Sequence, residues 1–495
     1  MQYKWRALIA VAFGTYMGTM DFSIVNVALP TLSEVFDRPP DTVVWASLIA
    51  SLVATGLTMV AGRGGDLYGR KRIYLAGWIV FGIGLVLASL ANTIELLIAF
   101  RALQAVGVAM VVANGNAIVT DAFPDNERGR ALGIVGSVVG AGLMTGPIVG
   151  GILLGIGDWR ALFWLRVPIV FIAFALAATQ IREQSGDHAV RKLDIPGSVT
   201  LFAFLSLTLL AVNRGQAWGW SSPTIVGLFV GGALSLAAFI RIESRSTSPV
   251  LSLTLFKART FSVAVSSLVI SFLGQSATLF LMPFYLIQVR GFSTARTGLI
   301  LATVPAMMLL LASFSGQVAD RYGFRYQTSL GIAIVAAGML SMSTIAADTP
   351  LPWVVARLAV LGIGSAIFMS PNSSEVMGSV PRSMLGTASA SLAAGRNIGT
   401  STGLAIAGAV LVIVASDAAG VSDVANARSL PPAALLDGFR AAFLVASGLV
   451  LVAVLVSLTR PAAIVAQNRA AATNPVAPSP APPATTDAID ATDSD

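Results

Sequence analysis

The stretch GRGGDLYGRKR, residues 62–72, decides how the rest of this chain is organised. It is rich in glycine and charge, and it separates two apolar runs that are each about 20 residues long, the length needed to cross a membrane. A similar stretch, GQVADRYGFR, occupies residues 316–325 and keeps the same order of glycine, acid, glycine and base. The chain therefore carries one short pattern twice, 254 residues apart.

Two further pairs of segments recur at nearly the same offset. The segment that begins at Arg101 is matched by one that begins at Arg357, and RGRALG at 128–133 is matched by RSMLG at 382–386. Three weak matches at nearly one offset indicate two copies of one unit. Because both glycine-rich stretches are expected on the same side of the membrane, the repeat is parallel, and transporters of this kind hold substrate near mid-membrane between the copies.

The composition is that of a membrane protein. Of the 495 residues, 55% are hydrophobic and only 11% are charged, whereas soluble proteins carry about 25% charged residues. Such a chain cannot cover a water-facing surface, so we expect an all-α, polytopic membrane protein. The net charge of +7 does not indicate nucleic-acid binding, because basic residues of membrane proteins collect in cytoplasmic loops.

Fourteen apolar segments have membrane-spanning length, the eleventh of them at 328–347. With the N-terminus inside, the cytoplasmic segments hold 20 Lys and Arg, Arg460 among them, against 7 in the outer loops. This asymmetry predicts a multi-pass protein of the cytoplasmic (inner) membrane with both termini in the cytoplasm. We expect a six-helix bundle at 1–190, two inserted transmembrane helices at 191–258 and a second six-helix bundle at 259–460. Residues 461–495, rich in Ala, Pro and Thr with acids at the end, predict a disordered cytoplasmic tail.

Several segments resemble the signatures of a known family. Residues 62–72 resemble the signature between helices two and three of the major facilitator superfamily, and RALQAVG at 101–107 resembles its fourth-helix signature. GLMTGPIVGG at 142–151 and MDFSIVNVALP at 20–30 resemble signatures of the fourteen-span drug/proton antiporters within it. The resemblance implies the major facilitator fold, proton-coupled export of drugs and a closing role for the glycine-rich loops. The first loop departs from the pattern at Gly64 and Leu67, so we expect the second loop to contribute more to closure.

Asp21 is the clearest candidate for chemistry, because a charge at the centre of a span costs about 2.5–3.5 kcal/mol on insertion scales and normally faces a partner or a cavity. Helical rise places Asp21 and Arg101 at similar depths, which allows them to pair or to share a cavity. A carboxylate beside a base stays ionised, whereas one buried alone takes up a proton. A cycle that alternates these environments loads and releases a proton, and the resemblance implies this role for Asp21. The alternative is that Asp21 only anchors helix packing.

Three further residues join this candidate site. Gln104 lies three residues after Arg101 and hence on the same helix face. The resemblance implies a coupling role for Arg101. The alternative for Arg101 is a structural bridge to a main-chain carbonyl. Asn26 belongs to the first-helix signature. Arg396, within RNIGTSTG, lies deep in a span and meets either a substrate anion or a counter-acid such as Glu375.

The two glycine-rich loops predict a cytoplasmic gate. Their glycines permit tight turns beside another helix, and Asp66 is placed to cap a helix N-terminus or to bind an arginine, with Arg130 as the first candidate. The alternative is a solvated basic loop that only sets topology. The predicted gate residues are Gly62, Asp66, Gly69, Arg70, Arg130, Gly316, Asp320, Arg321 and Gly323.

A third group of residues lies in the antiporter signature. Gly142, Gly146, Gly150 and Gly151 place small residues on one helix face and predict close helix packing, while Pro147 removes a main-chain hydrogen bond and is expected to kink the span. The resemblance implies that this element limits leak and favours export.

No other chemistry is visible in the sequence. There is no cysteine, and we find no metal-ligand cluster, phosphate-binding loop or nucleophile–base pair, so we expect neither an enzyme nor a metal, cofactor or ATP requirement. We expect a monomeric, proton-coupled exporter of small amphipathic compounds. A dedicated metabolite exporter or importer on the same fold is the alternative. The deep basic residues outnumber the one clearly deep acid, Asp21, and suit anionic substrates; they are Arg101, Arg166, Arg357 and Arg396. A membrane-embedded enzyme or receptor would need a catalytic constellation or a soluble domain.

Overall fold

The computed structural model describes residues 2–156, 158–183, 193–246, 249–420 and 431–460. Across these residues the secondary structure is helical, with no β-strand. Residues Met1–Arg460 form one compact unit. The tail predicted at 461–495 lies outside the described residues, as does the chain's single histidine, His188.

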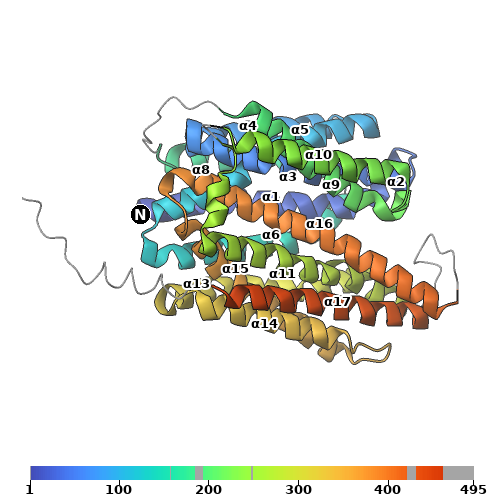
Figure 1. Ribbon diagram of the computed structural model, residues 1–495. Coiled ribbons are helices and arrows are strands. Elements are labelled where there is room, and N and C mark those ends of the chain that lie inside the picture. Colours follow the sequence, from blue (N-terminus) through green and yellow to red (C-terminus); the bar gives the residue numbers. More distant parts are fainter. Residues whose placement is uncertain (1, 157, 184–192, 247–248, 421–430, 461–495) are drawn as a thin grey trace, which may run out of the picture. The chain divides into compact units, whose positions relative to one another are not determined.

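The helices lie alongside one another in a bundle (Figure 1). The set that we call the N-terminal helices comprises α1 (Tyr3–Val35), α2 (Pro40–Val43), α3 (Trp45–Tyr68), α4 (Arg70–Ser89), α5 (Ile94–Ala122), α6 (Arg128–Ile156), α7 (Ala161–Trp164) and α8 (Val167–Gln180). Helices α9 (Ile195–Trp218) and α10 (Pro223–Glu243) follow as a packed pair. The set that we call the C-terminal helices comprises α11 (Arg259–Phe284), α12 (Thr294–Leu301), α13 (Thr303–Tyr322), α14 (Arg325–Met342), α15 (Leu351–Gly378), α16 (Leu385–Ala418) and α17 (Pro432–Leu458).

Thirteen of the described helices are long and apolar enough to cross a membrane, judged by length and composition. The eleventh span expected from the sequence, at 328–347, corresponds to α14, which has only 18 residues and is not among the thirteen. Its first turn contains Arg325, Tyr326 and Gln327, and these polar residues lower its mean hydropathy. Helix α14 nevertheless packs against α15 and α17 within the bundle. The structure thus differs from the expected fourteen spans by this one helix.

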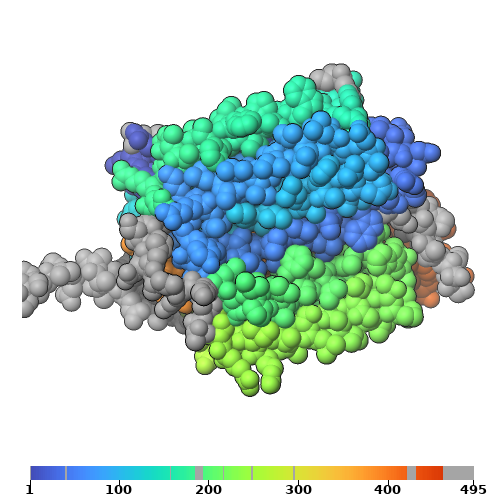
Figure 2. Space-filling model, turned by 90° about the horizontal axis from the view of Figure 1, so that it is seen from above, coloured from blue at the N-terminus to red at the C-terminus, as the bar shows by residue number. Residues whose placement is uncertain are grey.

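The N-terminal helices meet the C-terminal helices at two seams. At the first, α6 packs against α13 and also contacts α15; at the second, α16 packs against α3 and also contacts α5. Helix α9 contacts both α3 and α16, so it covers the second of these seams. Figure 2 shows the green α9–α10 pair lying along the blue N-terminal helices. Apolar side chains fill the contact, among them Met59 of α3, Leu201 and Leu205 of α9, and Ala390 of α16.

The stretch at 62–72 is not the loop that the sequence predicted. Helix α3 continues to Tyr68 and α4 begins at Arg70, so only Gly69 interrupts the helices, with a φ of +100°. In the second copy α13 ends at Tyr322, and Gly323 has a φ of +94°. This left-handed conformation strains every residue except glycine, and it ends a helix while satisfying its last carbonyls. We call the end of the bundle that carries Gly69 and Gly323 the glycine-loop end.

Candidate functional site

Asp21 lies at the centre of a buried polar cluster between α1, α5 and the start of α8. Its carboxylate accepts hydrogen bonds from Arg101 Nη1 at 2.9 and 3.1 Å, from Arg166 Nη1 at 2.5 Å and from Gln104 Nε2 at 2.8 Å. The exposed fractions of Asp21, Arg101 and Arg166 are 4%, 1% and 2%. The pairing of Asp21 with Arg101, which their depths allowed, is therefore present, and Gln104 joins it.

Arg166 was noted in the sequence only as a deep basic residue and was not assigned to the site. It lies just before α8, where its guanidinium bonds both Asp21 and the carbonyl of Leu162, at 2.5 Å in each case. Arg101 also donates from Nε to the carbonyl of Ala46 at 3.2 Å. The cluster therefore holds one carboxylate between two guanidiniums. A count of deep arginines against the single deep acid could have indicated a second partner for Asp21.

Asn26 does not belong to this cluster. Its amide donates to the carbonyl of Phe22 at 3.2 Å and accepts from Ser47 Oγ at 2.7 Å, and both contacts are exposed. Asn26 follows Asp21 by five residues, and a helix of 3.6 residues per turn rotates by about 140° beyond one full turn over that distance. The two side chains therefore leave α1 in different directions.

At the glycine-loop end, the carboxylate of Asp66 caps the N-terminus of α16. It accepts from the main-chain nitrogens of Gly386 at 2.8 Å and Thr387 at 2.9 Å. Arg70 donates to the same carboxylate at 3.0 Å and also donates to the carbonyl of Arg382, beside α16. The capping role expected for Asp66 is thus present, but its arginine partner is Arg70 and not Arg130. These contacts connect α3 to the C-terminal helices.

The second copy of the glycine-rich stretch makes the equivalent contact. Asp320, in the last turn of α13, accepts from the main-chain nitrogens of Gly129 and Arg130 at the start of α6, at 2.8 Å each. The guanidinium of Arg130 instead lies 5.3 Å from the ring centroid of Trp5. Arg321 is exposed and lies over the ring of Tyr322. The second loop therefore does not make more contacts than the first, contrary to the expectation from Gly64 and Leu67.

Close backbone approach explains the glycines that precede the two acids. A Cβ atom on Gly62 would lie 2.4 Å from the carbonyl oxygen of Gly386, and one on Gly316 would lie 2.0 Å from that of Gly129. These contacts make Gly129 the counterpart of Gly386, 257 residues apart. The sequence match had instead paired Gly133 with Gly386, because it aligned Arg128 with Arg382.

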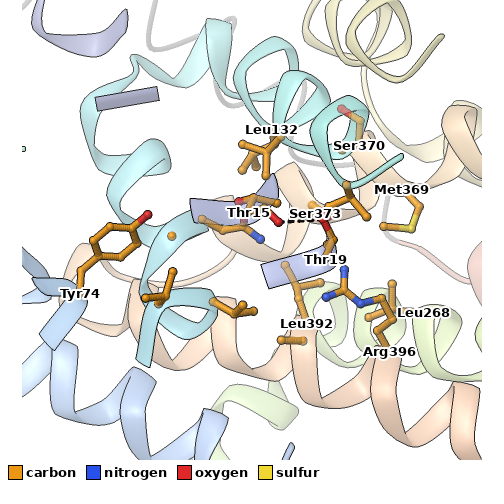
Figure 3. A pocket seen from close by; sticks show the side chains of 18 residues that line it. Thr15, Thr19, Tyr74, Leu132, Leu268, Met369, Ser370, Ser373, Leu392 and Arg396 are labelled. Carbon is orange, nitrogen blue, oxygen red and sulfur yellow. Dashed lines mark hydrogen bonds between the residues drawn. The ribbon is translucent and has the colours of Figure 1, made fainter. Parts of the chain in front are cut away.

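A cavity of about 70 Å³ lies between the N-terminal and the C-terminal helices. Figure 3 shows Arg396 pointing into it, with Thr15, Thr19 and Ser373 nearby. A buried water needs about 10–15 Å³, whereas pockets for drug-sized ligands measure about 300–1,000 Å³. The cavity therefore has room for only a few waters in this conformation and must widen to admit a larger molecule.

Arg396 forms no ion pair with Glu375, the acid that the sequence offered as one possible partner. Glu375 forms a buried ion pair with Arg460, whose guanidinium also donates to Thr328 Oγ1 at 2.8 Å and to Asn372 Oδ1 at 2.6 Å. Arg460 had been counted among the cytoplasmic loop charges, yet it is only 1% exposed. Of the two alternatives for Arg396, the pairing with Glu375 is wrong.

The glycine stripe of α6 packs against α1. Cβ atoms on Gly142, Gly146 and Gly150 would lie within 3 Å of Thr19, Ser23 and Ile24 of α1. Gly151 does not share this contact, because nothing lies within 4 Å of its Cβ position and it is exposed. Pro147 lies inside a continuous α6, with its side chain exposed.

We expect Gly142→Val to lower the stability of the purified protein by about 1 kcal/mol, the low end for an overpacked contact, because Thr19 Oγ1 and the Tyr16 carbonyl lie 2.0 and 2.9 Å from the added Cβ. The midpoint of thermal unfolding in detergent measures the change. Gly151→Val is the matched control on the same helix and should leave the midpoint unchanged. Equal shifts in both variants would contradict the packing role of the stripe.

Known proteins resemble this chain along most of its length. The family model described as Major Facilitator Superfamily matches residues 11–404 and 266–487. The riboflavin transporter RibZ of Clostridioides difficile (strain 630) is 34% identical over 406 residues, which cover 82% of this chain and 88% of that protein. The multidrug resistance protein Stp of Mycobacterium tuberculosis (strain CDC 1551 / Oshkosh) is 31% identical over 405 residues, covering 82% and 75% of the two chains.

The fold agrees with this match. The solved structure of the proton:xylose symporter XylE, bound to 6-bromo-6-deoxy-D-glucose, superposes with a TM-score of 0.61 at 15% identity, over 92% of this chain and 94% of that chain. This superposition shows that the two chains share a fold. The chain therefore belongs to the Major Facilitator Superfamily and is a membrane transporter.

Proposed function

We propose that this chain is a proton-coupled secondary active exporter, a drug/proton antiporter of the fourteen-span type that moves small amphipathic compounds out of the cell by alternating access. In this proposal residues 1–190 and 259–460 are two six-helix bundles that rock about the substrate, and 191–258 is an inserted pair. The protein acts as a monomer in the cytoplasmic membrane. The glycine-loop end and both termini face the cytoplasm, in agreement with the excess of Lys and Arg expected there.

The observation that carries the proposal is the position of α1. This helix holds Asp21 against Arg101 and Arg166, and it also lines the central cavity through Thr15 and Thr19. A movement of α1 that accompanies substrate binding therefore also changes the distance between Asp21 and its guanidiniums.

Proton coupling follows from that shared helix. Two guanidiniums stabilise the ionised carboxylate, whereas a carboxylate withdrawn from them in a low-dielectric interior takes up a proton. Asp21 would load a proton when α1 moves away and would release it when the cluster re-forms. The contacts of Asp66 and Asp320 hold the cytoplasmic side closed during the outward-facing part of the cycle. One proton moving inward supplies about 2.3 kcal/mol per 100 mV of membrane potential.

A dedicated metabolite transporter on the same fold is the second candidate, and one observation favours it. Arg396 is the only charged residue among those that line the central cavity, which is poor chemistry for a broad exporter of lipophilic cations. The relative named as a riboflavin transporter is also slightly more similar to this chain than the relative named as a multidrug resistance protein.

Purified protein in liposomes with an imposed pH gradient tests the proposal. We expect at least one compound from a panel of cations, neutral molecules and anions to drive proton release, followed with an optical pH indicator. Asp21→Asn should abolish proton-driven accumulation of that compound, because an amide neither gains nor loses the proton. It should retain exchange of labelled for unlabelled compound without a gradient, because the cavity is intact.

The exposed acid Asp158, which pairs with Arg160 at the other end of the bundle, supplies the control. Asp158→Asn should accumulate substrate at the wild-type rate. If Asp21→Asn still accumulates substrate against a proton gradient, proton coupling through Asp21 is wrong. If it is folded yet loses exchange as well, Asp21 serves packing and not coupling.

A further inference from the structure

We propose that Arg396 is the anion-binding residue of the central cavity, and that the compound bound there carries a negative charge, for example on a carboxylate. This inference deepens the proposed function, on which it rests only for the claim that the bound compound is the one transported. It assigns the class of ligand through one side chain and its surroundings.

The charge of the cavity is the first argument. Eighteen residues line it, and the guanidinium of Arg396 is the only charged group among them. Arg396 has no hydrogen-bond or ion-pair partner among the residues that the structure describes. An unpaired charge within a membrane bundle is costly, so the site gains most from a ligand that brings the missing negative charge.

Neither Asp21 nor Glu375 supplies that charge. Asp21 is held by Arg101 and Arg166 on the other side of α1, and Glu375 is held by Arg460. Within the described part of the chain, both carboxylates are therefore already committed to other guanidiniums. A cationic ligand would meet only the like charge of Arg396.

The polar groups around Arg396 suit a ligand that is held from both sides. Thr15 of α1 and Asn116 of α5 belong to the N-terminal helices, whereas Ser373 of α15 and Arg396 of α16 belong to the C-terminal helices. None of these three neutral side chains has a hydrogen-bond partner among the described residues. In contrast, Tyr74, Thr19 and Ser370 already donate to main-chain carbonyls.

This arrangement predicts how the ligand is oriented. A guanidinium presents a planar fork that matches the two oxygens of a carboxylate, and a lysine ammonium does not. Arg396 would hold the anionic group from the C-terminal helices, while Thr15 and Asn116 donate to or accept from its polar atoms on the other side. The remaining walls are apolar, among them Val112, Val139 and Leu268, and fit the apolar body of an amphipathic molecule.

Matched ligands that carry an acid, an amide or an amine on one aromatic scaffold test the inference on purified full-length protein in detergent, without a proton gradient. The probes are three aromatic families, each as acid, amide and amine: benzoate, benzamide and benzylamine; naphthoate, naphthamide and naphthylmethylamine; cinnamate, cinnamamide and cinnamylamine. Ligand-induced shifts in the thermal unfolding midpoint give the affinities. We expect at least one acid to bind about tenfold or more tightly than its amide, as for a charge-assisted hydrogen bond, and the amine to bind most weakly.

Two substitutions assign the effect to Arg396. In Arg396→Gln the advantage of acid over amide should disappear, while in Arg396→Lys it should persist at a weaker overall affinity, because the charge remains and the fork is lost. Arg357→Gln is the control. Arg357, like Arg396, is an arginine within a membrane-spanning helix, but it belongs to α15 and does not line the cavity. Its acid preference should equal that of the wild type. Size-exclusion chromatography and the ligand-free midpoint verify that each variant is folded.

The inference is overturned if no acid binds more tightly than its amide, or if Arg396→Gln keeps the acid preference. Its failure is distinguishable from failure of the proposed function. Acid binding through Arg396 with no substrate-driven proton movement would leave this inference standing and remove the antiporter. Proton-driven export of cations that is indifferent to Arg396 would do the reverse.

Discussion

Arg460→Met is expected to destabilise the folded protein by about 3–5 kcal/mol, because it leaves Glu375 as a buried charge without a partner. Arg460 is 1% exposed and Glu375 is 8% exposed. The guanidinium also donates to Thr328 and Asn372, so its removal leaves further buried polar groups unsatisfied. The midpoint of thermal unfolding in detergent measures the loss, and Glu375→Gln should show a loss of similar size.

Two comparisons distinguish the loss of a buried ion pair from a general effect of mutation just after α17. The double variant Glu375→Leu/Arg460→Met should recover most of the lost stability, because replacing both charges removes the uncompensated one. Arg440→Met, within α17, breaks a half-exposed pair with Asp437 at 3.5 Å and a hydrogen bond to the Ile345 carbonyl at 3.0 Å, and should cost about 1–2 kcal/mol, less than Arg460→Met. A double variant no more stable than the single ones would contradict this interpretation.

Gly316→Val is expected to open the glycine-loop end. The added Cβ would lie 2.0 Å from the carbonyl oxygen of Gly129, which belongs to the main chain and cannot rotate aside. Overpacking of this kind costs about 1–3 kcal/mol, which corresponds to about a 5- to 150-fold change in the ratio of closed to open molecules. The same displacement would separate Asp320 from the start of α6.

The absence of native cysteine makes the measurement direct. Spin labels on Asn126→Cys and Tyr322→Cys, both exposed positions beside this contact, report the separation of α6 and α13 by double electron–electron resonance. We expect Gly316→Val to enrich the longer distances strongly over the same labelled pair without it. Gly378→Val is the control at the same end, because nothing lies within 4 Å of that Cβ position. An unchanged distance distribution in Gly316→Val would show that the glycine contact does not govern closure.

The sequence by itself determined the class of fold and the repeat. Apolar segments of spanning length follow directly from composition, since the bilayer imposes that length on a helix. The repeated glycine–acid–glycine pattern was visible because each element of it is local: Gly69 and Gly323 end helices through their own conformation. The meeting of Asp21 and Arg101 was also accessible, because helical rise gives their depths.

The tertiary structure alone decided the partners. Asp66 caps α16 some 320 residues later along the chain, Glu375 binds Arg460 and not Arg396, and Arg166 joins Asp21. The depth of a residue in a span determines the height of its side chain in the membrane. It does not determine the rotation of the helix about its axis or which helix is its neighbour. Asn26 is left out of the Asp21 cluster, and Arg396 faces the cavity, because rotation about the helix axis and the choice of neighbouring helix are set by packing between segments distant in sequence.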